Sequence, residues 1–78
     1  MYPLMGTIVL FTGDFVPNGW TACDGKVLPI EQYAALFAIL GPRYGGDGER
    51  TVGIPALKSP VPGTQYIMAI TGFFPMQP

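Results

Sequence analysis

The candidate reactive side chains in this 78-residue chain are Cys23, Asp24, Asp47 and Glu49. Two carboxylates at a fixed separation can hydrolyse a glycosidic bond, and a cysteine can act as a nucleophile when a base activates it. The chain has no histidine to serve as that base, so we expect Cys23 to be a buried, inert thiol. The carboxylates have simpler explanations in turns. The sequence therefore indicates no catalytic residue, no cofactor and no metal site.

The Asp24-Gly25 pair predicts a tight type I′ hairpin turn, because both central residues of that turn need positive φ. An aspartate there can also accept hydrogen bonds from nearby backbone N–H groups. The hairpin would join strands over residues 20–23 and 26–28. Its first strand carries Trp20, the only tryptophan, and a side chain of that size would anchor the core.

A second turn is predicted where three glycines interrupt any regular element. We call residues 44–48 the glycine-rich loop: Tyr44, Gly45, Gly46, Asp47 and Gly48. A nucleotide-binding loop would need Gly-Lys-Ser/Thr and then a helix, and an EF-hand-type calcium loop would need several spaced acidic or amide ligands. We expect a structural turn that Asp47 ties together, together with Arg43 or Arg50. Whether Asp47 and Glu49 bind an ion stays open.

The elements around these turns predict a single α+β domain over residues 1–78. Apolar residues at helical spacing predict a helix from Glu31 to Leu40, ended by Gly41 and Pro42. Strands are predicted over residues 6–12, 51–54 and 66–71. The first is apolar on both faces, which is typical of a strand covered on both sides. We expect a small sheet with the Asp-Gly hairpin, the helix packed on it, and the C-terminal strand paired with the N-terminal strand.

The composition favours association with other proteins. Hydrophobic residues make up 49% of the chain and charged residues only 12%, so apolar side chains must reach the surface. The apolar residues near the two ends form a candidate interface: Tyr2, Met5, Phe73, Phe74 and Met76. The four basic residues are scattered, which argues against nucleic-acid binding. No apolar run is long enough to span a membrane, and the N-terminus does not read as a signal peptide.

Several short motifs occur in one order along the chain: Gly6-Thr-Ile-Val-Leu-Phe11, Pro17-Asn-Gly-Trp20, Cys23-Asp-Gly25 and Tyr44-Gly-Gly-Asp-Gly48. In that order they resemble the phage tail collar domain family. The ending Tyr66-Ile-Met-Ala-Ile70 is similar to the closing strand of longer members. The chain departs from the family at Pro55-Ala-Leu-Lys-Ser-Pro-Val-Pro62, where members usually read Pro-Asp-Leu-Arg-Gly-Arg-Val-Pro. It also lacks the histidine-containing insertion of longer members, so receptor and metal binding are not carried over.

The resemblance implies a structural module of a phage or phage-derived tail, made in the cytoplasm and located in the virion tail. Related fibres are trimeric, so it implies a homo-oligomer, with a trimer favoured, that contacts other tail or particle proteins during host attachment. A second hypothesis is a free-standing module that binds a carbohydrate or cell surface through Tyr44 and Trp20. A third is a glycan hydrolase that uses Asp24, Asp47 and Glu49.

Overall fold

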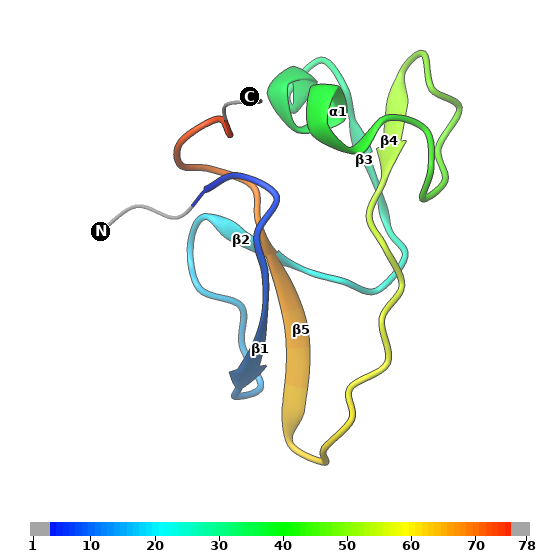
Figure 1. Ribbon diagram of the computed structural model, residues 1–78. Helices are drawn as coiled ribbons and strands as arrows, with labels where there is room; N and C mark the ends of the chain where they lie inside the picture. Colours follow the sequence, from blue (N-terminus) through cyan, green and yellow to red (C-terminus); the bar gives the residue numbers. More distant parts are fainter. Residues whose placement is uncertain (1–3, 76–78) are drawn as a thin grey trace.

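Five short strands and one helix follow one another in the computed structural model, which describes residues 4–75 (Figure 1). They are β1 (Ile8–Thr12), β2 (Trp20–Ala22), β3 (Val27–Pro29), α1 (Ala34–Leu40), β4 (Thr51–Gly53) and β5 (Thr64–Ala69). The predicted α+β class is confirmed. Strands β1, β5 and β2 form one sheet, and β3 and β4 form a second, two-stranded sheet beside the helix.

Strand β5 is the centre of the larger sheet, with β1 on one side and β2 on the other, both antiparallel to it. Because β5 comes near the end of the chain and β1 near its start, their pairing joins the two ends, as predicted. Beyond the strands, Leu4 and Phe73 form a further bridge, and the backbone N–H of Met5 donates to the Phe73 carbonyl at 2.8 Å.

A β-bulge delays the start of β1 by two residues relative to the predicted strand. The N–H of Gly6 donates to the Ala69 carbonyl at 2.8 Å, and the Ala69 N–H donates to the Thr7 carbonyl at 2.9 Å. Two residues of one strand therefore face a single residue of the other. Gly6 has φ of 90°, a value that glycine adopts easily and that this kind of bulge requires.

The predicted Asp-Gly hairpin is wrong, because β2 and β3 belong to different sheets. Strand β2 pairs with β5, and β3 pairs with β4. Within residues 4–75 only glycines have positive φ, so Asp24 cannot take its place in a type I′ turn. Gly25 alone has the required sign, with φ of 87°. Asp24 instead bridges Ala56, and residues 23–26 carry the chain from one sheet to the other.

The helix carries its apolar stripe where the spacing predicts it but begins later, at Ala34 rather than Glu31. The residues before it form tight turns, in which the N–H groups of Gln32 and Tyr33 both donate to the Pro29 carbonyl. No side chain caps this end, which is consistent with the late start. The other end is as predicted, since the Gly41 N–H donates to the Phe37 carbonyl at 2.7 Å.

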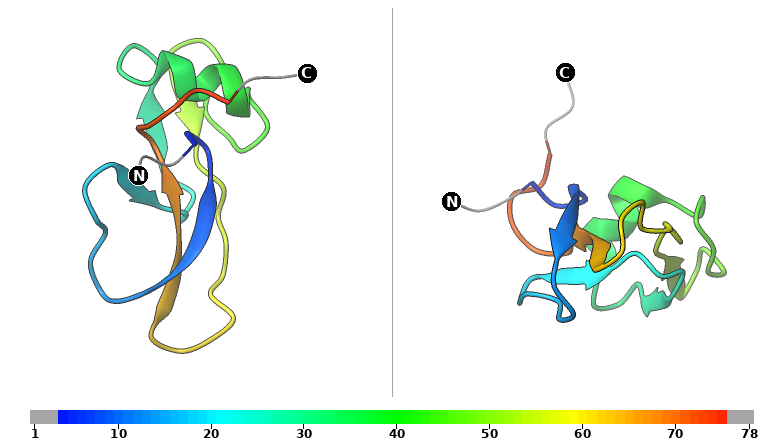
Figure 2. Two further views of the ribbon diagram at one scale, coloured as in Figure 1. Left: turned by 60° about the vertical axis from the view of Figure 1, so that its left-hand side comes forward. Right: turned by 90° about the horizontal axis from the view of Figure 1, so that it is seen from below.

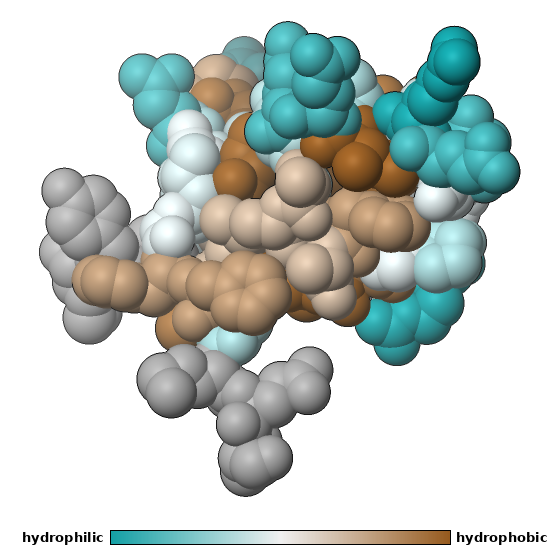
Figure 3. Space-filling model, turned by 90° about the horizontal axis from the view of Figure 1, so that it is seen from above, coloured by the Kyte–Doolittle hydropathy of each residue, from teal (hydrophilic) through white to brown (hydrophobic). Residues whose placement is uncertain are grey.

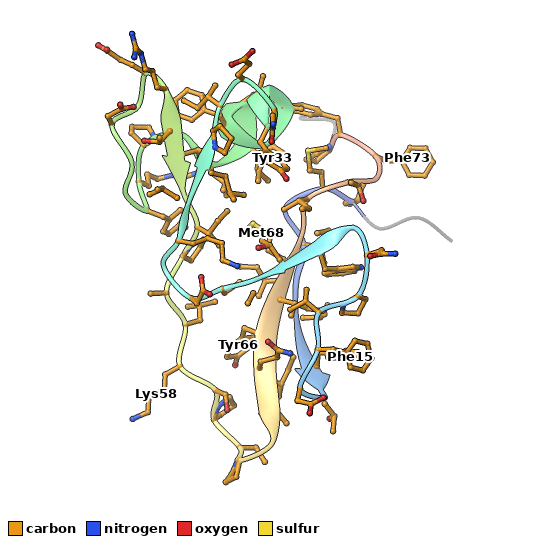
Figure 4. The ribbon with its side chains drawn as sticks, turned by 180° about the vertical axis from the view of Figure 1, so that it is seen from behind. Phe15, Tyr33, Lys58, Tyr66, Met68 and Phe73 are labelled. Atoms are coloured by element: carbon orange, nitrogen blue, oxygen red, sulfur yellow. The ribbon has the colours of Figure 1, made fainter. Side chains whose placement is uncertain are left out.

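One core joins both sheets and the helix. Its buried members are Cys23, Leu36, Leu40, Val52, Ile54 and Met68, and Met68 lies centrally between the elements in Figure 4. Trp20 is only half-buried and is not part of this core, so the prediction that it anchors the core is wrong. Side chains alternate along a strand, and Thr21 and Cys23 are the buried residues here. Alternation predicted two opposite faces but not which of them turns inward.

Candidate functional site

Asp24 is engaged in its own turn. Its Oδ1 accepts a hydrogen bond from the backbone N–H of Lys26 at 3.1 Å, and its Oδ2 lies 3.5 Å from the Lys26 ammonium nitrogen. The first contact is the geometry of an Asx turn. The Lys26 Nζ also donates to the Thr21 hydroxyl at 3.2 Å. The Asp24 side chain is exposed, so an ion pair of this kind contributes little to stability.

Asp47 organises the backbone that follows it. Its Oδ1 accepts hydrogen bonds from the N–H groups of Glu49 at 2.9 Å, Arg50 at 2.7 Å and Thr51 at 3.0 Å. The Thr51 hydroxyl in turn accepts the Asp47 N–H at 2.9 Å. Hydrogen bonds to a carboxylate favour its charged form. The backbone donors at Arg50, Glu49 and Thr51 therefore lower the pKa of Asp47 from 3.8 to about 2.

The two arginines expected to help Asp47 do so only in part. Arg50 contributes its backbone N–H to the Asp47 carboxylate. Arg43 turns to the helix instead, where its guanidinium donates to the carbonyls of Leu40 and Ile39, each at 3.0 Å. A cation at that position complements the negative end of the helix dipole. Arg43 also lies 5.8 Å from the ring centroid of Tyr44, over the ring.

The glycine-rich loop lies directly against the backbone of β4. The Gly53 N–H donates to the Gly45 carbonyl at 3.1 Å, and the Gly48 N–H donates to the Thr51 carbonyl at 3.2 Å. A Cβ on Gly46 would lie 2.6 Å from the Thr51 carbonyl oxygen, and one on Gly53 would overlap the carbonyl of Tyr44. Glycine at both positions therefore permits the close contact. Asp47 and these glycines together fix the loop on the small sheet.

An open depression of about 520 Å³ lies beside this loop and is lined by Pro29, Ile30, Glu31, Glu49 and Arg50. Neither Asp24 nor Asp47 lines it, so the three carboxylates of the hydrolase hypothesis do not share it. Glu31 was not among the predicted site residues, because on the sequence it reads as the first turn of a helix. Residues 4–75 contain no group of three or more His, Cys, Asp or Glu side chains that could hold a metal ion.

The candidate interface at the chain ends divides into exposed and packed residues. Phe73 and Phe74 are more than half exposed, as is Leu4 beside them, and the Phe73 ring points away from the ribbon in Figure 4. Met5 packs against the core. Tyr2 and Met76 lie outside the described residues. Figure 3 shows apolar residues gathered across the α1 end of the molecule, with hydrophilic residues along the top and right of that view.

Strand β1 forms a second exposed apolar surface. It lies at the outer edge of its sheet (Figure 2), and Ile8, Val9 and Leu10 are between 38% and 43% exposed. The prediction that this strand is covered on both sides is therefore wrong for the isolated chain. An apolar edge strand without a cover is uncommon in a protein that works alone.

Comparison with protein families gives one result, a match of residues 6–62 to the model described as Phage Tail Collar Domain. That range holds β1 to β4, the helix and the glycine-rich loop. The chain belongs to the phage tail collar domain family. No curated protein and no solved structure matches it. The matched range ends before β5, yet β5 is the strand that holds β1 and β2 together in this collar domain.

Membership places this collar domain among the structural modules of phage tails, a family that is not enzymatic. The glycine-rich loop and the Asp24 turn, two of the motifs behind the resemblance, both lie within the matched range. In the structure both are occupied by internal hydrogen bonds. Among the described residues, no helix is long and apolar enough to cross a membrane.

Proposed function

We propose that this collar domain is a structural assembly module of a phage or phage-derived tail, which works by self-association and by contact with other tail proteins. The observation that carries the proposal is the exposed apolar surface, at Leu4, Phe73 and Phe74 and again along β1. Contiguous apolar area of this kind marks a partner surface. The carboxylates of Asp24 and Asp47 accept hydrogen bonds from the backbone of their own turns. The proposed function assigns no reaction to either of them.

The proposed assembly is a homo-oligomer with a trimer as the expected number of copies, located in the virion tail and taking part in host attachment. The trimer comes from the resemblance to trimeric fibres, and the apolar surface supports association in general. Electron microscopy of particles labelled with an antibody against this chain tests the location. Labelling confined to the tail is expected. The absence of the chain from purified particles would contradict the proposal.

A second candidate function is recognition of a surface carbohydrate through Tyr44, which is an exposed aromatic side chain. Sugars stack on exposed aromatic faces, but Arg43 lies over this ring and would have to move aside. Screening the purified domain against immobilised glycans tests this function. Binding that disappears in Tyr44→Ala would favour it, and absence of binding to any glycan would leave the assembly role as the better explanation.

A further inference from the structure

The backbone of β1 offers hydrogen-bonding groups to a neighbour. In an antiparallel pair, alternate residues direct their N–H and C=O groups toward the partner strand. The Ala69 N–H donates to the Thr7 carbonyl, so the register places Val9 and Phe11 on the β5 side as well. The N–H and C=O groups of Ile8, Leu10 and Thr12 therefore point away from β5, toward the open edge of the sheet.

Apart from the β-bulge at Gly6 and Thr7, which lies just before β1, nothing in the sequence of this strand protects its edge. Proteins usually guard an edge strand with a charge, a proline or a very short length, and residues 7–13 contain neither a charged residue nor a proline. The opposite edge differs, because β2 has only three residues and its Trp20 N–H already donates to the Pro17 carbonyl at 3.2 Å. Of the two edges of this sheet, β1 is the one able to pair.

We propose that β1 pairs antiparallel with β1 of a second copy of the chain, about a two-fold axis that passes beside Leu10. This inference rests on the proposed function, since it names the surface through which copies associate. Leu10 then lies opposite Leu10 of the second copy, and Ile8 lies opposite Thr12. Two hydrogen bonds for each of the three outward-facing pairs give about six in all.

The distribution of charge favours a second copy in this orientation. The charged residue nearest to β1 along the chain is Asp14, in a segment that the Gln65 side chain holds by donating to the carbonyls of Gly13 and Phe15. Antiparallel pairing about Leu10 places Asp14 opposite Gly6 of the second copy, so the two Asp14 carboxylates lie at opposite ends of the contact. Parallel pairing would bring them side by side, where like charges repel.

A two-fold contact uses the same surface on both copies and closes after two. It therefore adds copies in pairs and does not extend into a filament. If trimers also form through another surface, the β1 contact joins two trimers into a hexamer. With the proposed trimer, the expected mass in solution is that of a hexamer, and without it that of a dimer.

Charge substitutions at Leu10 test the contact and its register together. In Leu10→Lys two like charges face each other across the two-fold axis, and the same holds for Leu10→Glu. Each variant alone should associate less through β1, with the dissociation constant of the β1–β1 contact raised about tenfold or more. An equimolar mixture should restore it, because opposite charges then face each other. Leu57→Lys is the matched control, since Leu57 is exposed to 41% and Leu10 to 43%.

Light scattering gives the mass of each sample at several concentrations, and circular dichroism shows whether each variant is folded. If Leu10→Lys does not fold, Thr12→Pro removes one outward N–H at the end of the strand and should weaken pairing. A trimer that neither Leu10 variant alters would overturn the β1 contact and leave the proposed function standing. A wild-type monomer at every concentration would overturn both. Folded single variants that fail to associate when mixed would refute the Leu10 register.

Discussion

Truncating Leu36 to alanine should destabilise the whole domain. Leu36 lies on α1 and is 1% exposed, within the core that joins both sheets. The change removes three carbon atoms, which corresponds to roughly 2.4 kcal/mol at about 0.8 kcal/mol for each buried CH₂ group. The cavity left behind adds to this, giving about 3–4 kcal/mol in the usual range for such substitutions. A domain of this size has a total stability of only about 4–12 kcal/mol.

Urea unfolding followed by two signals measures the effect. Circular dichroism reports on the helix, and fluorescence of Trp20 reports on the larger sheet. Because one core links these parts, both signals should move together to a lower midpoint in Leu36→Ala. Leu57→Ala makes the same change at an exposed position and should alter stability by less than about 1 kcal/mol. A Leu36→Ala midpoint equal to wild type, or two signals with separate midpoints, would refute the single shared core.

Three further predictions concern the turns and the thiol. The free energy of unfolding should fall as the pH is lowered from about 4 to about 2, because the pKa of Asp47 in the folded chain is about 2, below its ordinary value of 3.8. In Asp47→Asn this part of the pH dependence should be missing. Gly53→Ala should lower the stability by about 1–3 kcal/mol, since the new Cβ would overlap the Tyr44 carbonyl, and a midpoint equal to wild type would contradict the packing of the glycine-rich loop on β4. Cys23 should react with a thiol reagent at mildly alkaline pH only slowly until urea unfolds the chain, because burial, and to a smaller extent the Asp24 charge, raises its pKa; rapid labelling of the native protein would contradict its burial.

The sequence predicted the structure correctly where residues close together along the chain determine it, as in the helix. The spacing of Leu36 and Leu40 predicted the buried face of the helix, and Gly41 predicted its end. The start was placed at Glu31, three residues too early, because residues 30–33 form tight turns and no side chain caps this end of the helix. The pairing of the first and last strands, a contact between distant segments, was also predicted, because both segments are apolar on both faces.

The failures come from contacts between distant parts of the chain. The pair Asp24-Gly25 is typical of a hairpin, but the strands on either side of it do not pair with each other. Strand β2 pairs with β5, and β3 pairs with β4. The depression beside the glycine-rich loop joins Glu31 to Glu49 and Arg50, residues separated by the helix and that loop. The exposure of β1 could not be predicted either, because an apolar strand reads the same whether it is covered within the chain or by a second copy.

The mass of the wild-type chain in solution tests most directly whether contact is its function. Light scattering should give a mass above that of one copy, which rises toward a fixed multiple as the concentration increases. A mass of 8.4 kDa at every concentration, with the chain folded and its apolar surfaces exposed to water, would contradict the account.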